Sequence, residues 1–313
     1  MEIASPNKTR VLVVGLGKIG MMYDYYASPK KAILTHSQAI YNHPSFILDG
    51  GVDIDFKRRK LFEKKFSAKS FKNIKTAFIK KKPNLVVIST NINQQFDTFK
   101  KIIKYPSVKI VLCEKPFALN IFQAKKMIRL AKTHNISIFV NYIRLFQPST
   151  AIVIKTINSR KIGNNLVVWA HYNNGIFNNG SHIINLINKF MGKKKKTSVL
   201  SKGKRINSYD HNSILKISYD KGLAYFFPIN KNNFSAEFEI VGSKGRLYYS
   251  NRKIKVNRFN KNKKTKEQNI KQNMKKYQYY VYQNIKEFLD GKTKSICDET
   301  SAMDTLKTLS ETR

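Results

Sequence analysis

The chain has 313 residues, of which 42% are hydrophobic and 12% aromatic, which excludes an intrinsically disordered protein and suffices for two domains with separate cores. No apolar run approaches the ~20 residues of a membrane span, and the start, MEIASPNKTR, lacks the apolar stretch of a signal peptide. Two cysteines, Cys113 and Cys297, provide no disulfide framework, and the histidines show no metal-ligand spacing. We therefore expect a cytoplasmic protein without a metal site or a membrane partner.

The net charge of +40 is typical of proteins that bind polyanions. However, 48 of the 59 basic residues are lysines, whereas bidentate recognition of phosphates and bases favours arginine. Lysine, asparagine and isoleucine also have A/T-rich codons, so a biased genome would produce this composition. We therefore expect no specific nucleic-acid partner. The charge nevertheless leaves open the hypothesis of a polyanion-binding protein. This hypothesis predicts nucleic-acid binding that survives about 150 mM salt.

The first part of the chain alternates between short apolar runs and segments with helical periodicity. The predicted strands are residues 10–15, 46–52, 84–90, 108–113 and 136–141. The predicted helices are residues 56–66, 94–104 and 121–134, and another is expected to start at Met21. This alternation predicts an α/β fold in which residues 1–143 form a doubly wound parallel sheet that binds a nucleotide.

After Pro148 the pattern changes to consecutive short strands separated by turns rich in Asn, Gly and Lys. The predicted strands are residues 166–172, 213–219, 223–228, 236–241, 246–249 and 253–258. The predicted helices are residues 150–158, 181–191, 274–289 and 299–310. We expect residues 144–313 to form an α/β domain with a large, mostly antiparallel open sheet, and the polar segment 260–272 to be a mobile loop.

A glycine motif, GxGxxG, lies between the first predicted strand and helix. Its glycines allow a tight turn, a close approach of the backbone to a pyrophosphate, and close packing of helix on strand. The helix N-terminus would then offer free N–H groups to the phosphates. The residues expected to bind the cofactor here are Gly15, Gly17, Lys18, Ile19 and Gly20; the alternative is that the glycines only form a turn.

Asp53 ends the second predicted strand, where a carboxylate binds the adenosine ribose and favours NAD over NADP. It follows Gly20 by 33 residues instead of the usual ~20, so an insertion must lie within residues 23–44. Two alternatives remain. The first is that Asp53 only caps the next helix and does not bind the ribose. The second is that the cofactor is NADP, whose 2′-phosphate the neighbouring Lys57, Arg58 and Arg59 would suit.

The sequence Cys113-Glu114-Lys115-Pro116 follows a buried strand, at the edge where open α/β sheets bind ligands. A lysine at this edge, partly desolvated and beside a cationic nicotinamide, is suited to transfer a proton. Pro116 restricts the turn that directs the Lys115 side chain.

Six segments, in order, resemble the Gfo/Idh/MocA oxidoreductases, which include glucose–fructose oxidoreductase, inositol dehydrogenases and sugar-nucleotide dehydrogenases. They are VGLGKIG, GGVDID, CEKPFAL, VNYIRLFQP, NNGSHIINL and VGSKGRL. The resemblance implies a Rossmann domain and an α/β domain whose open sheet often forms a dimer or tetramer interface. It also implies hydride transfer between NAD(P) and a carbinol carbon of a sugar-like substrate.

The resemblance also implies roles for residues near the cofactor. Lys115 matches a lysine that contacts substrate and cofactor and joins in proton transfer, and Glu114 matches a glutamate near the nicotinamide ribose. The remaining positions implied to line the cofactor site are Ser89, Thr90 and Asn91, where the family usually has a Thr-Pro turn, and Gln95, where a His is common.

In the second domain, Arg144 matches a basic residue that binds substrate, and His182 matches a histidine that meets the reacting hydroxyl. The carboxylates usual at two nearby positions are replaced by Asn178 and Asn185. Because Asn cannot take a proton at neutral pH, Lys115 and His182 would carry the proton while Asn178 orients the substrate. The alternative is a dinucleotide-binding sensor or accessory subunit with weakened catalysis.

Two segments resemble family members associated with bacterial surface-polysaccharide synthesis: GIFNNGSHIINL and YDYYASPKKAILTHSQAIYNHPSF. The second accounts for the long gap before Asp53. Within it, His36 follows Thr35, a predicted helix N-cap, and is interpreted as structural. Four tyrosines at 277, 279, 280 and 282 have helical spacing and are expected in a core or a subunit interface.

Overall fold

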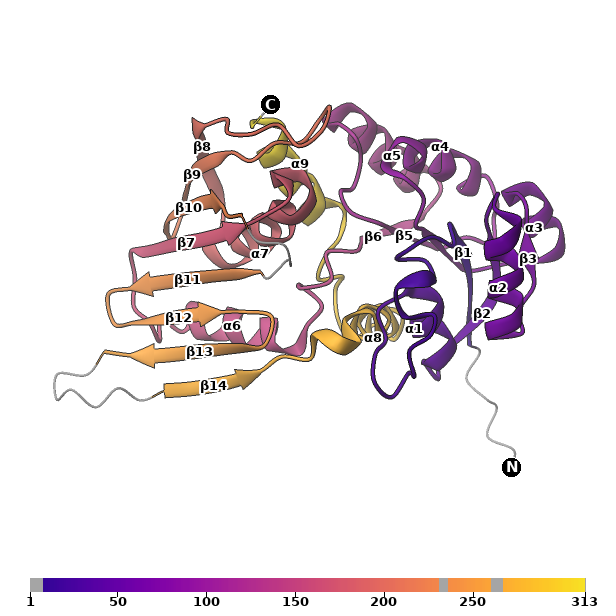
Figure 1. The fold of residues 1–313 in the computed structure, drawn as a ribbon, viewed down its shortest axis with the longest axis horizontal. Helices are drawn as coiled ribbons and strands as arrows, with labels where there is room; N and C mark the ends of the chain where they lie inside the picture. Colours follow the sequence, from indigo (N-terminus) through magenta and orange to yellow (C-terminus); the bar gives the residue numbers. More distant parts are fainter. Residues whose placement is uncertain (1–7, 231–235, 260–266, 313) are drawn as a thin grey trace. The chain divides into compact units, whose positions relative to one another are not determined.

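The computed structural model describes residues 8–230, 236–259 and 267–312. The chain forms two compact units (Figure 1), one of Met1–Ile143 with Lys275–Thr300 and one of Arg144–Met274 with Ser301–Arg313. The expected first domain ends where the long segment of the first unit ends. Residues 275–300, expected in the second domain, cluster with the first unit, because α8 (Tyr277–Leu289) packs against α1 (His36–Asn42).

The first unit is built on a six-stranded parallel sheet in the order β3-β2-β1-β4-β5-β6, with helices on both faces (Figure 1), which confirms the predicted doubly wound fold. Every residue of β4 and β5 is buried, because a sheet covered on both faces needs uninterrupted apolar strands. The strands are β1 (Thr9–Val14), β2 (Phe46–Val52), β3 (Ser70–Phe71), β4 (Leu85–Ile88), β5 (Ile110–Cys113) and β6 (Ser137–Val140).

Four helices of the first unit begin at side chains that accept backbone N–H groups. The helices are α2 (Phe56–Phe66), α3 (Ile74–Lys80), α4 (Ile92–Ile102) and α5 (Ile121–Thr133). Their caps are Asp55, Asn73, Asn91 and Asn120. Asp55, and not Asp53, therefore caps α2, which removes one of the two alternatives for Asp53.

The first helix of the unit is interrupted. The prediction that it runs on from Met21 is wrong, since only a short 3-10 turn, η1 (Met22–Asp24), follows the glycine motif. The helix resumes at α1, where the N–H of His36 donates to the carbonyl of Ile19 at 3.1 Å. Helix α1 thus continues the turn that the glycine motif begins.

This continuation fixes the length of the insertion. In an uninterrupted α-helix, residue 23 would donate to the carbonyl of Ile19, four positions earlier. His36 takes that place, so 13 residues are inserted, and they fall within the predicted range of 23–44. Without them, Asp53 would follow Gly20 by 20 residues, the usual distance in dinucleotide-binding domains.

The inserted segment is held at its end by the buried carboxylate of Asp24. This carboxylate accepts hydrogen bonds from the N–H groups of Leu34 and Thr35, at 2.6 and 3.0 Å, and from the Thr35 hydroxyl at 2.6 Å. Hydrogen bonds to a buried charge are strong, so they fix the point at which the chain re-enters α1.

The second unit contains an eight-stranded sheet in the order β14-β13-β12-β11-β7-β10-β9-β8 (Figure 1). All neighbours pair antiparallel except β7 and β10, which confirms the predicted mostly antiparallel sheet. The strands are β7 (Leu166–Tyr172), β8 (Lys194–Ser201), β9 (Ile214–Tyr219), β10 (Gly222–Pro228), β11 (Glu237–Gly242), β12 (Gly245–Tyr249), β13 (Lys253–Arg258) and β14 (Glu267–Lys271). The helices are α6 (Pro148–Asn158), the π-helical η2 (Gly175–Gly180), α7 (Ser181–Met191) and α9 (Glu299–Ser310), and the 3-10 turn η3 (Met274–Lys276) precedes α8.

The two edge strands of this sheet, β8 and β14, were not predicted from the sequence. The expectation of a loop over 260–272 is wrong for β14, which pairs with β13, while residues 260–266 lie outside the described part of the chain. β8 is rich in lysine and lacks an apolar alternation. Lysines are common on edge strands because they discourage pairing with another sheet.

One face of the second sheet is buried and the other is open. Along β7, Val168 and Ala170 are buried, whereas Trp169 between them is 43% exposed. Trp169 stacks on Tyr225 at 4.9 Å between ring centroids, and Tyr225 is followed by Phe227 on the same face. The open face therefore carries an aromatic cluster of Trp169, Tyr225 and Phe227.

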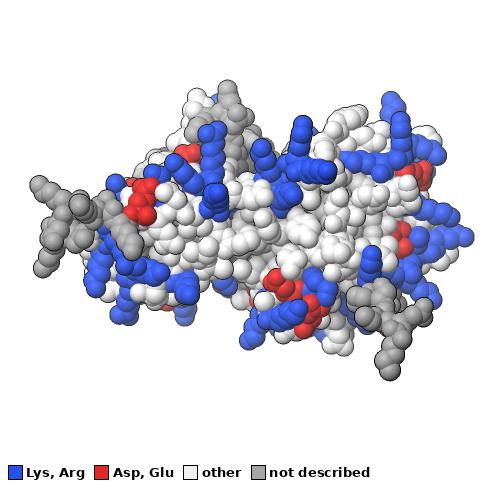
Figure 2. All heavy atoms as spheres, turned by 90° about the horizontal axis from the view of Figure 1, so that it is seen from below, with Lys and Arg blue, Asp and Glu red and all other residues white. Residues whose placement is uncertain are grey.

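Figure 2 shows lysine and arginine side chains spread over the visible face and separated by uncharged atoms, with few acidic groups between them. This distribution is typical of solvated surface charge rather than of one continuous binding stripe. Among the described residues, no helix is both long enough and apolar enough to cross a membrane. The same residues contain no group of three His, Cys, Asp or Glu side chains placed to hold a metal ion.

Candidate functional site

The glycine turn after β1 brings backbone atoms closer than side chains would allow. Gly15 has a φ of +99°, and a Cβ atom there would lie 2.6 Å from the carbonyl oxygen of Ser89. A Cβ atom on Gly20 would lie 2.0 Å from the carbonyl oxygen of Gly15. At Gly17, by contrast, the nearest atom to an added Cβ is Nη1 of Arg58 at 3.8 Å, so this glycine leaves open space. Gly15 and Gly20 are thus required by the close packing of the turn itself, whereas the predicted role of Gly17 beside a pyrophosphate stays a prediction.

Asp53 connects the end of β2 to this turn. It is buried, and its carboxylate accepts the N–H of Leu16 at 2.7 Å and the N–H of Asp55 at 2.9 Å. Nη1 of Arg58 lies 3.7 Å from the same carboxylate. Asp53 therefore holds the glycine turn in place, and its contact with an adenosine ribose stays a prediction.

A pocket of about 770 Å³ opens between these segments, at the point where the strand order reverses between β1 and β4. Open α/β sheets bind ligands at such switch points. The pocket is lined by Val14, Gly15, Gly17, Val52, Asp53, Ile54, Arg58, Lys72, Asn73, Ile74, Lys75, Ser89, Thr90, Asn91, Gln94, Asp97, Thr98 and Lys101. Of the three cations proposed for a 2′-phosphate, Arg58 lines it, whereas Arg59 donates to the backbone carbonyls of Asp53 and Ile54.

The segment after β4 forms one wall of this pocket. Ser89 donates to the carbonyls of Val14 and Gly15, at 3.1 and 2.7 Å, and so ties β4 to the glycine turn. Asn91 caps α4. The hydroxyl of Thr90 is buried and has no hydrogen-bond partner among the described residues. A buried hydroxyl of this kind in a pocket wall calls for a ligand that hydrogen-bonds to it.

The side chain of Gln95, on α4, fixes the turn after β5 by hydrogen bonds to its backbone. The Gln95 side chain is buried, and its Nε2 donates to the carbonyls of Glu114, Pro116 and Phe117 at 3.1, 3.2 and 2.7 Å. Gln95 was expected to contact the cofactor, but its amide is committed to fixing the turn that carries Lys115. The peptide bond between Lys115 and Pro116 is cis.

Only some of the residues that were predicted to bind the cofactor line this pocket. The predicted residues that line it are Gly15, Gly17, Asp53, Ser89, Thr90 and Asn91. The predicted residues outside its lining are Lys18, Ile19, Gly20, Gln95, Glu114 and Lys115. Glu114 is nevertheless close in the fold, because its N–H donates to the carbonyl of Ile88 at the end of β4.

In the second unit, Asn178 lies in the π-helical segment η2 and His182 in the first turn of α7, which follows directly. The N–H groups of Phe177 and Asn178 donate to the buried carboxylate of Asp210, at 2.9 and 3.0 Å. Burial raises the pKa of Asp210, while these hydrogen bonds oppose the rise. Asp210 therefore positions the segment that carries both predicted site residues. π-helical segments are frequent at functional sites.

Sequence reasoning missed Asp210. The only available signal was that it is the sole acidic residue among residues 193–219. Arg144 is buried, and its Nη2 donates to Asn251 at 3.2 Å. Asn185 donates to the hydroxyl of Thr305 on α9 at 2.9 Å, so this asparagine contributes to helix packing.

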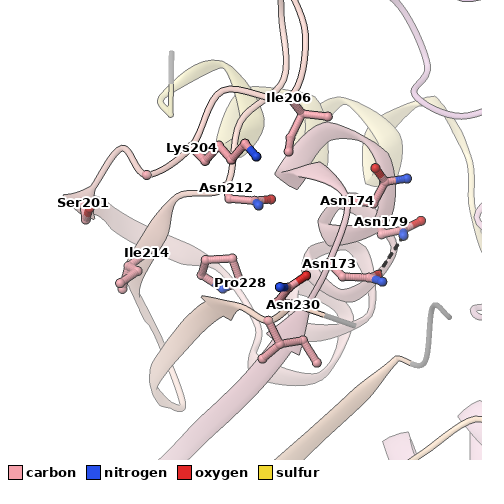
Figure 3. A pocket seen from close by; sticks show the side chains of 12 residues that line it. Asn173, Asn174, Asn179, Ser201, Lys204, Ile206, Asn212, Ile214, Pro228 and Asn230 are labelled. Carbon is pink, nitrogen blue, oxygen red and sulfur yellow. Dashed lines mark hydrogen bonds between the residues drawn. The ribbon is translucent and has the colours of Figure 1, made fainter. Parts of the chain in front are cut away.

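A second pocket, of about 800 Å³, lies in the same unit, beside η2 and the carboxyl ends of β7 and β10 (Figure 3). In Figure 3, Asn174 and Asn179 lie on one side of it and Ser201 on the other, and Asn179 donates to Asn173 at 2.9 Å. Amides, one lysine and apolar groups line the pocket: Asn173, Asn174, Asn179, Ser201, Gly203, Lys204, Ile206, Asn212, Ile214, Pro228, Ile229 and Asn230.

Residues 9–142 match the Gfo/Idh/MocA family model, described as an oxidoreductase family with an NAD-binding Rossmann fold. The match covers most of the first unit, which is an NAD-binding Rossmann domain, and it indicates an oxidoreductase. None of the curated protein sequences matches the chain.

Solved structures share the fold over nearly the whole chain. An oxidoreductase from Agrobacterium radiobacter, solved with NAD+, L-tartaric acid and magnesium, has a TM-score of 0.79 at 14% identity, covering 97% of this chain and 94% of that one. The UDP-N-acetylglucosamine 3-dehydrogenase of Acidithiobacillus ferrooxidans has a TM-score of 0.77 at 13% identity, covering 98% and 97%. A 3-ketoreductase from Actinomadura kijaniata, solved with TDP-benzene and NADP, has a TM-score of 0.77 at 14% identity, covering 97% and 96%.

The residues of the first unit fit a dinucleotide. Gly17 leaves room for a pyrophosphate, Thr90 offers a buried hydroxyl, and Asp53 stands at the end of β2. Arg58 and the lysines of the pocket wall supply positive charge for the phosphates.

Substitution of Gly17 and of Gly20 by alanine should have different effects on the stability of the protein. Gly17→Ala should leave the free energy of unfolding within about 1 kcal/mol of the wild type, because its methyl group meets only Arg58. It should weaken NADH binding by at least about tenfold, since the methyl group occupies the space for the pyrophosphate. Gly20→Ala, the matched variant, should lower the free energy of unfolding by about 3 kcal/mol or more, because its Cβ atom collides with backbone.

Urea unfolding and calorimetric titration with NADH measure both quantities. Unchanged NADH affinity in a folded Gly17→Ala protein would show that the pyrophosphate does not approach this turn.

Proposed function

We propose that the protein transfers a hydride between the nicotinamide of NAD(P) and a hydroxyl-bearing carbon of a carbohydrate, most suitably a sugar nucleotide. The observation that carries this proposal is the position of the Glu114–Lys115 turn. It follows β5, next in the sheet to β4, whose own end forms a wall of the dinucleotide pocket. An acid–base group beside the nicotinamide end of such a site is what oxidation of an alcohol requires.

Bound NAD(P) supplies the nicotinamide carbon that gives or takes the hydride. The protein must then move one proton at the reacting oxygen. In our proposal the Nζ atom of Lys115 and the ring of His182 carry this proton, and Asn178 and Arg144 position the substrate. Asn178 would contribute by hydrogen bonding alone, because an amide does not ionise at neutral pH.

The carbohydrate part of the proposal is supported by the chemistry of the pocket in the second unit, whose lining includes Asn179 but none of Arg144, Asn178 and His182. Amide side chains satisfy hydroxyl groups as donors and as acceptors, and the apolar side chains Ile206, Ile214 and Pro228 suit the carbon face of a sugar ring. Two proteins of the same fold are a UDP-N-acetylglucosamine 3-dehydrogenase, named for a sugar nucleotide, and a 3-ketoreductase that was solved with the nucleotide compound TDP-benzene. The resemblance of GIFNNGSHIINL and the segment before Asp53 to polysaccharide-associated family members supports a role in surface-polysaccharide synthesis, which we place in the cytoplasm.

The test of this function is a screen of UDP- and TDP-sugars with NAD+ and NADP+, following the absorbance of the reduced nicotinamide. Lys115→Met should keep dinucleotide binding but lower turnover by at least about 100-fold, the usual scale for a lost acid–base group. Lys132→Met, which removes an exposed lysine on α5, is the control and should retain full activity.

Full turnover in Lys115→Met would remove this lysine from the mechanism. Reduction of the cofactor by none of the sugars would instead favour the sensor or accessory subunit, whose motivation is the absence of carboxylates at Asn178 and Asn185.

We also propose that the open face of the second sheet is a subunit interface of a homodimer or homotetramer. Exposed tryptophans at the centre of an aromatic cluster are typical of such interfaces. Trp169→Lys should therefore weaken association by about 2 kcal/mol or more, measured by light scattering over a dilution series. Ile152→Lys, at an exposed apolar position on α6, should leave the oligomer intact. An unchanged mass for Trp169→Lys would place the interface elsewhere.

A further inference from the structure

His36 is completely buried in the first unit and contacts the glutamate next to the predicted catalytic lysine. Its Nε2 lies 2.9 Å from Oε1 of Glu114. Its Nδ1 lies 2.9 Å from Nε2 of Gln278 and 3.0 Å from the hydroxyl of Tyr282, both on α8. Both ring nitrogens are therefore engaged.

These contacts define the state of the imidazole ring. Gln278 donates to Nδ1, and its carbonyl oxygen in turn accepts from Asn141 at 3.2 Å. An ionised carboxylate only accepts hydrogen bonds, so Nε2 of His36 donates to Glu114. Asn141 donates to the same carboxylate oxygen at 2.5 Å. Two side-chain donors thus converge on Oε1 of Glu114.

The surroundings of Glu114 act in opposite directions on its charge. Burial raises the pKa of this carboxyl group. The hydrogen bond and electrostatic interaction with His36, the hydrogen bond from Asn141 and the positive charge of Lys115 lower it, and the net pKa lies below the ordinary value. The other titratable groups facing Glu114 are Cys113 and Tyr282, whose pKa values are raised by burial, so both are neutral at physiological pH. His36 and Lys115 are therefore the groups that can respond to the charge of Glu114.

The insertion in the first helix is what brings His36 to this place. In a continuous helix, residue 23 would occupy the position of His36, and Tyr23 is more than half exposed on the surface instead. Thr35 then caps α1, and Asp24 fixes the chain just before it. The insertion therefore places the buried imidazole of His36 beside the Glu114–Lys115 turn. The sequence had indicated only a structural role for this histidine.

We propose that His36 is a positioning residue for the reaction, which holds the Glu114 carboxylate in one orientation and keeps it ionised beside Lys115. A carboxylate near an amine favours the ammonium form, so Glu114 raises the proton affinity of Nζ of Lys115, the group that accepts a proton in oxidation and delivers it in reduction. The catalytic part of this inference rests on the proposed function, whereas the link between His36 and the charge of Glu114 is a property of the protein alone.

The test is a ¹³C NMR titration of the glutamate side-chain carboxyl groups in the protein without substrate, between about pH 5 and pH 8, with Glu114→Gln assigning the signal. In the wild type, Glu114 should remain ionised throughout. In His36→Met the donor is lost, and the pKa of Glu114 should rise by at least about one unit, into or toward this range. His36→Gln keeps a donor near the position of Nε2 and should restore most of the wild-type titration.

His43 provides a matched control. It is also buried between α1 and α8, but it hydrogen-bonds to Gln283 and not to Glu114. His43→Met should therefore leave the Glu114 titration unchanged. An identical titration in His36→Met and the wild type, or an equal shift in His43→Met, would overturn the proposal.

If His36→Met does not fold, Glu114→Gln tests the same contact from the other side. It should change the ring-nitrogen chemical shifts of His36 and leave those of His43 as they are; unchanged His36 shifts would contradict the proposal.

With an active substrate in hand, the acidic limb of the pH profile of kcat/KM should also move to higher pH in His36→Met. Because the NMR titration needs no substrate, its failure is distinct from a failure of the proposed function, which would appear as absent turnover.

Discussion

The contact between Gly20 and the carbonyl group of Gly15 is the constraint on which the first unit depends. It allows the turn after β1 to close against the end of β4, where Ser89 joins both strands through its hydroxyl. Asp53 closes the same turn from β2 by accepting the N–H of Leu16. Three strand ends are thereby fixed around one pocket, and a dinucleotide site at that position needs little rearrangement to form.

A second set of contacts fixes the neighbouring turn after β5. Gln95 holds its backbone from α4, while His36 and Asn141 hold the Glu114 side chain. Residues from α1, from α4 and from the segment after β6 therefore act on one short turn, and Gln278 and Tyr282 of α8 contact His36 in addition. This explains why residues 275–300 belong with the Rossmann domain: α8 completes the environment of Glu114. Polar networks of this kind stabilise a site only when each buried group is paired, as most are here.

The sequence predicted the elements with strong local signals. The strand over 46–52 and the helices over 56–66 and 181–191 have the predicted limits: apolar residues mark the strand and the second helix, Asp55 caps the first helix, and Gly192 ends the second. β8 and β14 were missed because pairing at the sheet edge, and not apolar patterning, makes them strands. The contacts of His36 could not be predicted either, since its partners Glu114 and Tyr282 lie 78 and 246 residues away. Asp210 likewise gained its role only through the fold.

The central claim of this account is that the pocket between β1 and β4 holds a dinucleotide. Calorimetric titration of the wild-type protein with NADH and with NADPH, in about 150 mM salt to suppress nonspecific binding to its positive surface, tests it most directly. We expect saturable binding with one site per chain; a preference for NADH would assign the ribose contact to Asp53, and a preference for NADPH would assign the 2′-phosphate to Arg58. Binding of neither dinucleotide would contradict the account and leave the charge of +40 as the main indication of function.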